Sequence, residues 1–282
     1  MEPQSRHSPS TSVSHVKRES SVLPGITRRL VQSIKTVGLP ETLLRIARKP
    51  FILLRNRKIL QRESMPERFE EIYRLNHWGG SESVSGEGSA LEATQNLRDR
   101  LPGLFRKFEI KTVFDAPCGD YNWMSHVVEA NDISYVGGDI VKPLIDNLKP
   151  REKDNITFTV FDLTTDAFPK ADLWLSRECW FHLSYIDQVK MLKGFVASDI
   201  PYVLATSEFS ENQVVNRDIR SGDYRPMDLF AEPYGFPRDT LHEIEDWRPP
   251  NPRRQMYLWT RDQVRVALEG FEKKAVKMRK RV

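Results

Sequence analysis

The stretch Lys111-Thr-Val-Phe-Asp-Ala-Pro-Cys-Gly-Asp120 contains a short apolar strand, an acid at its end and a turn that follows at once. Gly119 lets the backbone of that turn pass close to a ligand, because glycine has no Cβ. In a parallel α/β sheet, a ligand lies across the carboxyl ends of the strands, where the first strand turns tightly into a helix. The stretch therefore predicts an α/β fold with a ligand site at the end of its first strand.

Strand-like and helical runs alternate along the chain on both sides of this stretch. Besides Thr112–Asp115, the expected parallel strands are Ser134–Asp139, Thr157–Phe161, Leu173–Ser176 and Tyr202–Thr206. Helices are expected at Ser89–Phe108, Lys142–Leu148 and Tyr185–Ser198. Two later runs, Leu241–Ile244 and Gln255–Trp259, are expected to pair antiparallel at the sheet edge. The alternation predicts a seven-stranded, mostly parallel sheet with helices on both faces.

The chain before this region has a different composition. Residues 1–25 are rich in Ser, Pro and His and predict a disordered tail. Residues 26–64 interleave apolar residues with arginine and predict a basic helical extension. A further helix, Pro66 to Leu75, is expected to follow Ser64 as N-cap, with Glu67 at the capping-box position. We place the folded domain at residues 65–270 and a basic tail at residues 271–282.

Formal charge is unevenly distributed along the chain. Residues 27–62 carry +9 and residues 271–282 carry +5, whereas residues 63–270 carry −11, within a net charge of +4. An acidic body argues against a nucleic-acid groove, so no nucleic-acid partner is expected. Two interpretations of the basic extension stay open: a solvated amphipathic face, or peripheral docking on an anionic membrane through residues 27–62.

Composition also indicates the cellular compartment in which the protein is expected. No apolar run approaches the roughly 20 residues that a membrane-spanning helix needs, and the first residues lack the apolar core of a secretory signal. Only two cysteines are present, too few for a disulfide framework. We expect a cytoplasmic protein, with peripheral contact with the inner face of a membrane as the open alternative.

Two further acids follow the next two strands. Asp139 ends the run Tyr135-Val-Gly-Gly-Asp139, 24 residues after Asp115, where a carboxylate would accept both hydroxyls of a ribose. Asp162 follows the third strand, where it would lie beside an adenine amino group. Asp115 and Asp139 can also be interpreted as ordinary strand-end acids, but their joint spacing favours a nucleoside-bearing cofactor.

These motifs together resemble the class I, Rossmann-like, S-adenosylmethionine-dependent methyltransferases. The run Asp115–Asp120 is similar to the glycine-rich first motif of that family, with Pro117 where the family has glycine. Asp139 and Asp162 match its acids after the second and third strands, and Asp172–Ser184 resembles its acceptor-facing motif. The resemblance covers residues 65–260. Its four motifs occur in the expected order on the expected strands.

The resemblance implies S-adenosylmethionine as the cofactor. The cofactor-binding positions that it implies are Asp115, Pro117, Cys118, Gly119, Asp120, Trp123, Asp139 and Asp162. Cys118 is interpreted as a small buried thiol that fills the turn, and Trp123 as a core or pocket-wall aromatic. An acidic cradle suits a cationic sulfonium better than a pyrophosphate, and the G-x-G-x-x-G pattern of dinucleotide binding is absent.

Candidate acceptor residues follow the fourth and fifth strands. His182 is the candidate general base, and a structural role for this histidine stays open. The candidate substrate-binding residues are Arg177, Glu178, Arg217, Asp223 and Arg225. Arg177 and Glu178 are also compatible with a local ion pair, and the stretch 216–228 with a solvated loop. No cluster of carboxylate metal ligands is evident, so no metal is expected.

A narrower resemblance concerns the acceptor. The run Trp78–Ser89, followed by the first motif, resembles a bacterial subgroup associated with polysaccharide and lipopolysaccharide genes. It implies O-methylation of a sugar hydroxyl, so the expected partner is a glycan or a small polar metabolite. Two alternatives stay open: a methyltransferase acting on a small-molecule amine, and a non-catalytic binding module that retains the fold. The oligomeric state is not predicted.

Overall fold

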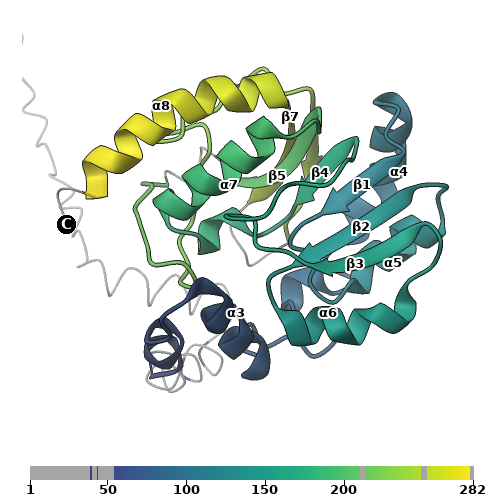
Figure 1. Ribbon diagram of the computed structural model, residues 1–282, viewed down its shortest axis with the longest axis horizontal. Helices are drawn as coiled ribbons and strands as arrows, with labels where there is room; N and C mark the ends of the chain where they lie inside the picture. Colours follow the sequence, from purple (N-terminus) through teal and green to yellow (C-terminus); the bar gives the residue numbers. More distant parts are fainter. Residues whose placement is uncertain (1–38, 40–42, 44–53, 210–213, 249–252, 280–282) are drawn as a thin grey trace, which may run out of the picture. The chain divides into compact units, whose positions relative to one another are not determined.

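The computed structural model describes residues 39, 43, 54–209, 214–248 and 253–279 (Figure 1). The chain divides into two compact units, Met1–Arg48 and Lys49–Val282, and the sheet belongs entirely to the second. The predicted disordered tail and most of the predicted basic extension lie outside the described residues. Among the described residues, no helix is both long and apolar enough to cross a membrane.

Seven strands form one sheet in the order β3-β2-β1-β4-β5-β7-β6. Their bounds are β1 Thr112–Asp115, β2 Ser134–Asp139, β3 Ile156–Val160, β4 Leu173–Ser176, β5 Tyr202–Glu208, β6 His242–Glu245 and β7 Arg254–Thr260. The pairs from β3 to β5 are parallel, and β7 runs antiparallel to both of its neighbours. The predicted α/β, Rossmann-like, mostly parallel sheet is confirmed, including the antiparallel pair at its edge. The strand order reverses between β1 and β4, which leaves a crevice at the carboxyl ends of these strands.

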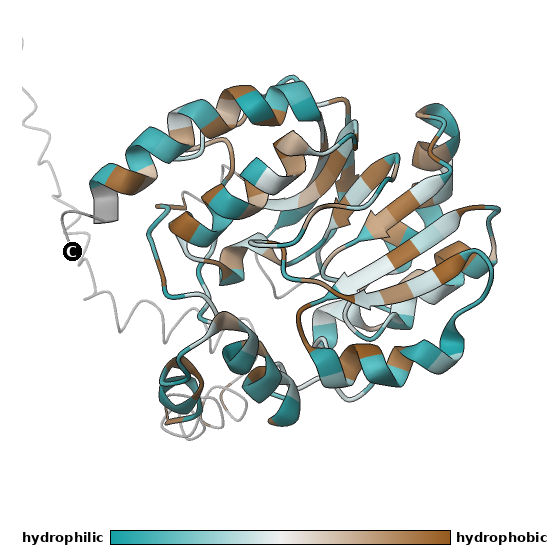
Figure 2. Cartoon of the chain, viewed as in Figure 1, coloured by the Kyte–Doolittle hydropathy of each residue, from teal (hydrophilic) through white to brown (hydrophobic). Residues whose placement is uncertain are grey.

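Helices cover both faces of the sheet, because successive apolar side chains of each strand point to opposite faces. On one face pack α4 Gln95–Lys107, α5 Asn122–Glu129 and α6 Lys142–Leu148; on the other pack α7 Tyr185–Ala197 and α8 Arg261–Arg279. Val113 and Leu175 belong to the first core, whereas Phe114 and Trp174 belong to the second. The helices alternate between hydrophilic and hydrophobic residues along their length, as amphipathic helices on a sheet do (Figure 2).

Helix α3, Met65–Arg74, precedes the sheet and carries the predicted capping box. Ser64 Oγ accepts from the Glu67 backbone N–H, and the Glu67 carboxylate accepts from the Ser64 N–H at 3.1 Å. On the same helix the buried Glu71 carboxylate pairs with Lys58 at 3.4 Å and Arg62 at 3.1 Å. Hydrogen bonds from its basic partners, above all Arg74, lower the pKa of Glu71 to about 2. Two cations of the predicted basic extension therefore pair with the domain.

Two predicted boundaries differ from the structure. Helix α4 begins at Gln95 rather than Ser89: residues 87–89 form a 3-10 turn, residues 91–94 form a further turn, and the Leu91 N–H donates to the Glu82 carboxylate. Helix α8 crosses the boundary that we placed between residues 270 and 271. Phe271 and Ala275 are buried in the core shared with α7, so residues 271–279 continue a packed helix.

Candidate active site

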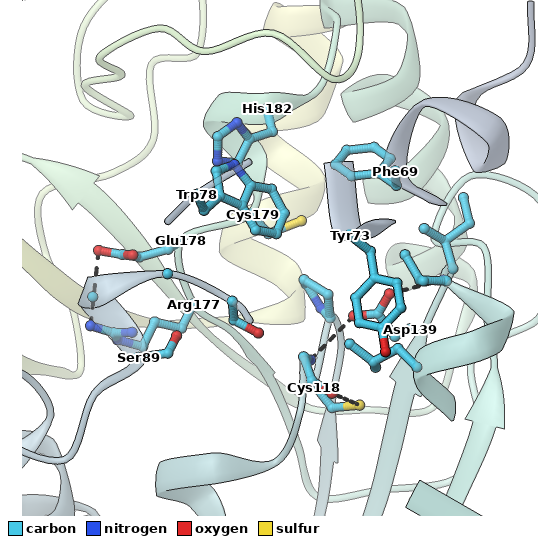
Figure 3. A pocket seen from close by; sticks show the side chains of 18 of the residues that line it. Phe69, Tyr73, Trp78, Ser89, Cys118, Asp139, Arg177, Glu178, Cys179 and His182 are labelled. Atoms are coloured by element: carbon cyan, nitrogen blue, oxygen red, sulfur yellow. Dashed lines mark hydrogen bonds and ion pairs between the residues drawn. The ribbon is translucent and has the colours of Figure 1, made fainter. Parts of the chain in front are cut away.

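A cavity of about 480 Å³ lies at the carboxyl ends of β1, β2 and β4 (Figure 3). One side is formed by the turn after β1 and the end of β2, and the other by the residues after β4. Helix α3, the segment 84–89 and Arg254 of β7 complete its wall. Asp139 and Tyr73 lie on the first side in the close-up view, and Trp78, Glu178 and His182 on the second. The cavity occupies the place where a sheet of this order binds ligands.

Asp139 ends β2 on the first side of the cavity and is buried. Its Oδ1 accepts from the Val141 N–H at 3.0 Å, and its Oδ2 accepts from the Gly119 N–H at 3.2 Å. Burial nevertheless raises the pKa of Asp139 to about 6. An ionised carboxylate has about four acceptor positions, so two amide donors leave Asp139 able to accept from a ligand.

Asp115 ends the neighbouring strand β1 and also lines the cavity. The Tyr135 hydroxyl donates to its Oδ2 at 2.7 Å. Burial, together with the nearby charge of Asp139, raises the pKa of Asp115 to about 7. Two buried acids with raised pKa values in one cavity mark a candidate functional site. A ligand that brings hydroxyl donors or a positive charge would suit both.

The turn after β1 forms the part of the cavity wall that lies next to Asp115 and Asp139. Pro117, Cys118, Gly119 and Trp123 line the cavity. Cys118 is buried, and burial raises the pKa of its thiol, which keeps it protonated and unreactive. This supports the interpretation of Cys118 as a small thiol that fills the turn. The Trp123 ring forms part of the wall, with the Arg177 guanidinium 5.7 Å from its centroid.

Two acids predicted to bind the cofactor do not line the cavity. The Asp120 carboxylate accepts from the Ser83 hydroxyl at 2.9 Å and from the Val84 N–H at 3.0 Å. The Asp162 carboxylate accepts from the backbone and hydroxyl of Thr164, both within its own turn. Phe161 and Leu163, the residues on either side of Asp162, line the cavity instead. The Asp162 carboxylate therefore makes contacts within its own turn, whereas the Asp120 carboxylate contacts a segment 37 residues earlier in sequence.

His182 lies on the second side, in the 3-10 turn η3, Trp180–His182. Its Nδ1 is 2.9 Å from the Asp223 carbonyl oxygen. Because a carbonyl oxygen only accepts, Nδ1 carries the proton and Nε2 keeps its lone pair. Burial among rings, including Trp78 at 5.4 Å, lowers the pKa of His182 to about 4. The imidazole is therefore neutral near neutral pH.

Arg177 and Glu178 follow β4 and both line the cavity. Arg177 donates from Nε and Nη2 to the two oxygens of Asp246, each at 2.8 Å. Glu178 pairs with Arg254 at 3.0 Å, and only at 3.9 Å with Arg177. The local Arg177–Glu178 ion pair is therefore present, but each residue also has a closer partner elsewhere in the fold. Glu178 also has φ +50°, an uncommon conformation for a side chain of this size that often marks functional sites.

Three predicted substrate-binding residues do not line the cavity. Arg217 is exposed on the surface. Asp223 contributes its carbonyl oxygen to His182, while its carboxylate accepts from the Tyr224 N–H. Arg225 is fully buried and donates to the Leu183 carbonyl at 2.7 Å and the Tyr234 hydroxyl at 2.8 Å. The prediction placed these three in the acceptor site because polar density in a loop does not reveal which way a side chain points. Their neighbour Tyr224 does line the cavity.

Several lining residues were missed from the sequence. Helix α3 contributes Met65, Phe69 and Tyr73, which are spaced by four residues and so share one face. This spacing was a usable signal for an apolar helix face, though not for its position over a ligand site. Arg254 reaches the cavity only through the pairing of β7 with β5, which no local pattern indicates. Within the described ranges, no group of three or more His, Cys, Asp and Glu side chains is arranged to hold a metal.

No family model matches the chain, and no curated protein matches it. Similar solved structures include the methyltransferase domain of bacterial CtHen1-CN, at 16% identity over 60% of this chain and 99% of that one, with a TM-score of 0.46. Human N-acetylserotonin methyltransferase shows 12% identity over 76% of this chain and 68% of its own, with a TM-score of 0.44. The magnesium protoporphyrin IX methyltransferase of Synechocystis PCC 6803 shows 9% identity over 78% and 98%, with a TM-score of 0.43. Similarity of this size establishes no activity for this chain.

Proposed function

We propose that this protein transfers a methyl group from S-adenosylmethionine to a hydroxyl oxygen of a sugar or glycan. The observation that carries the proposal is the pair of buried acids, Asp115 and Asp139, at the ends of adjacent strands. Both line a cavity that continues to His182, a neutral imidazole with an available lone pair. One half of the cavity therefore suits a cationic nucleoside, and the other suits an acceptor that loses a proton.

The first half fits the cofactor by its chemistry. Burial raises the pKa of Asp115 to about 7 and that of Asp139 to about 6, so a ligand that donates hydrogen bonds or brings positive charge would favour the ionised carboxylates. Ribose hydroxyls would donate to Asp139, and a positive charge would compensate Asp115. Phe161 and Leu163 offer apolar surface for a base. When bound, S-adenosylmethionine would supply a methyl group activated by its sulfonium.

The second half fits a neutral polar acceptor. Arg177 is paired with Asp246, and Glu178 with Arg254, so the charges in this wall balance. Among the described residues, nothing donates a hydrogen bond to Glu178 Oε2 or His182 Nε2. Hydroxyl groups both donate and accept, which matches this mixture of acceptors and guanidinium donors. The rings of Trp78 and Tyr224 add flat surface against which a sugar ring would pack.

His182 would act as the general base in this arrangement. The Asp223 carbonyl fixes Nδ1–H, which directs proton uptake to Nε2. A proton taken from the acceptor would create an imidazolium, and the negative charge of Glu178 favours that state. Positioning and proton removal are the main tasks left to the protein, since the methyl group arrives activated.

A small-molecule amine is the second candidate acceptor. The observation that favours it is the low pKa of His182, about 4, which makes the imidazole a weak base. A neutral amine attacks without prior deprotonation, so it places less demand on a base.

The experiment has two stages. Calorimetric titration with S-adenosylmethionine measures binding, and incubation of a lysate with methyl-labelled cofactor, followed by mass spectrometry, identifies labelled products. Label on a sugar oxygen supports the proposal, and label on an amine nitrogen favours the second candidate. Binding without any labelled product would indicate a binding module that retains the fold. Absence of binding would overturn the assignment of the cofactor.

A further inference from the structure

The Asp120 carboxylate holds a segment whose first residue, Ser83, lies 37 residues earlier in sequence. We call residues 83–89 the bridging segment. The Asp120 carboxylate accepts from the Ser83 hydroxyl at 2.9 Å and from the Val84 N–H at 3.0 Å. Both are charge-assisted hydrogen bonds, which are stronger than neutral ones. Ser83 is buried, and its hydroxyl also accepts from the Ser85 N–H at 3.1 Å. The hydrogen bonds therefore run from Asp120 through Ser83 to Ser85.

The bridging segment contacts both halves of the cavity. At one end, a Cβ on Gly119 would lie 2.2 Å from Ser85 Oγ, so the segment is laid directly on the turn after β1. At the other end, a Cβ on Gly88 would lie 2.6 Å from Glu178 Oε2. Residues 84–89 line the cavity between these two contacts. The segment is therefore one wall shared by the turn after β1 and by Glu178.

Besides the Asp120 carboxylate, the first part of this wall is held by the Asp120 N–H, which donates to Ser85 Oγ at 3.4 Å, and by packing of Val84 against the core. The bridging segment contains two glycines, Gly86 and Gly88, and Gly86 has φ +99°. Glycine-rich backbone loses much conformational entropy when it is ordered, so hydrogen bonds from a fixed group are needed to offset that cost. Asp120 is such a group, because it follows Gly119 in the turn that β1 and α5 define.

We infer that Asp120 is a positioning residue that acts through the bridging segment and does not bind the cofactor. Its carboxylate holds Ser83 and Val84, which keeps Ser85 against Gly119 and Gly88 against Glu178. Loss of this tether would loosen the wall of both half-sites together. The inference rests on the proposed function for the identity of the cofactor, but the tether itself is independent of it.

The test compares the full-length wild type with Asp120→Ala and Ser83→Ala, which break the same hydrogen bond from opposite ends. Amide hydrogen exchange in the unliganded proteins should rise about tenfold or more across residues 83–89 in both variants, which is about the exchange factor that loss of 1.4 kcal/mol gives. The turn at residues 117–123 should change far less. Asp120→Asn keeps one acceptor oxygen and should give an intermediate increase. Asp146→Ala, which removes an exposed acid of α6, is the matched control and should leave residues 83–89 unchanged.

Affinity for S-adenosylhomocysteine, measured by calorimetry on the same proteins, separates positioning from direct binding. A tether predicts that both variants weaken binding, and that Asp120→Ala weakens it more, because Asp120→Ala also removes the hydrogen bond from the Val84 N–H. Unchanged affinity in Ser83→Ala beside a loss of more than tenfold in Asp120→Ala would overturn the inference, because it would make Asp120 a direct ligand. Unchanged exchange at residues 83–89 in both variants would also overturn it. If the wild type does not bind, the proposed function fails, while the exchange data still decide the tether.

Discussion

Arg177 and Asp246 form a bidentate ion pair across 69 residues of sequence, with both nitrogen–oxygen distances at 2.8 Å. Both residues are buried, and the pair joins the end of β4 to the chain that leaves β6. The Arg177 guanidinium faces the cavity beside the Trp123 ring. The pair therefore links the stability of the fold to the shape of the site.

Removing one member of this pair should destabilise the protein strongly. Asp246→Ala leaves the Arg177 charge buried without its main partner, which typically costs about 3–5 kcal/mol in the free energy of unfolding. Urea denaturation measures this value. The double variant Arg177→Met/Asp246→Leu is the control, and it should recover much of the loss because no charge is left unpaired. A loss below about 1 kcal/mol in Asp246→Ala would show that water compensates Arg177.

Cofactor binding should depend on pH through Asp115 and Asp139. Their pKa values in the unliganded protein are raised by burial to about 7 and about 6. A ligand that donates hydrogen bonds or positive charge favours the ionised acids, so binding releases protons. Affinity for S-adenosylhomocysteine should therefore fall as the pH drops from about 8 to about 5. Calorimetry in two buffers of different ionisation enthalpy measures both quantities, and constant affinity over this range would contradict the expectation.

Loss of the His182 imidazole should affect turnover far more than binding. His182→Ala should lower kcat by roughly 10²–10⁴ while affinity for S-adenosylhomocysteine stays within about twofold, as expected for a general base. Because burial lowers the pKa of His182 to about 4, its protonation should not limit the rate between about pH 6 and pH 8. Turnover is measured with the acceptor that the labelled-cofactor assay identifies. Near-normal turnover in His182→Ala would assign this histidine a structural role and favour an amine acceptor.

The basic extension offers a separate prediction about membranes. We propose that the extension at residues 27–62 docks on anionic lipid through residues 27–53, most of which lie outside the described residues, at about 1 kcal/mol for each Lys or Arg near the surface. Lys58 and Arg62 pair with Glu71, so a shortened chain should begin at Leu54 and retain them. The full chain should pellet with vesicles of anionic phospholipid, less so in high salt, and the shortened chain should not. Equal pelleting of both chains would discard the membrane interpretation.

Local patterns predicted the central part of the fold closely. The bounds of β1, β2, β4 and α6 agree with the structure because each apolar run is short and is closed by a turn, an acid or proline. Ser64 and Glu67 predicted the start of α3, since a capping box is a contact between residues three apart. Asp115 and Asp139 were predicted at the ends of the first two strands, and the structure pairs these strands in parallel, which brings their carboxyl ends to one edge.

The acceptor side was less predictable because its contacts are distant in sequence. The partner of Arg177 lies 69 residues away, and the tether of Asp120 reaches back 37 residues to Ser83. Arg225 was assigned to the site because its loop is polar, yet it donates inward to Tyr234. Orientation of this kind depends on tertiary packing, which neither spacing nor composition records.

The central claim is that Asp139 binds the ribose of S-adenosylmethionine. Asp139→Ala should weaken S-adenosylhomocysteine binding by about 1.5–3 kcal/mol, because charge-assisted hydrogen bonds to hydroxyl groups are lost. Asp139→Asn is the control; it retains one acceptor oxygen and should lose less. Circular dichroism establishes that each variant is folded before titration.

Calorimetric titration of S-adenosylhomocysteine into the wild type and Asp139→Ala is the most direct test. The arrangement of Asp115, Gly119 and Asp139 predicts saturable binding to the wild type, and at least tenfold weaker binding to the variant, the factor that corresponds to about 1.4 kcal/mol. Absence of binding to the wild type, or equal affinity in a folded Asp139→Ala, would contradict the assignment.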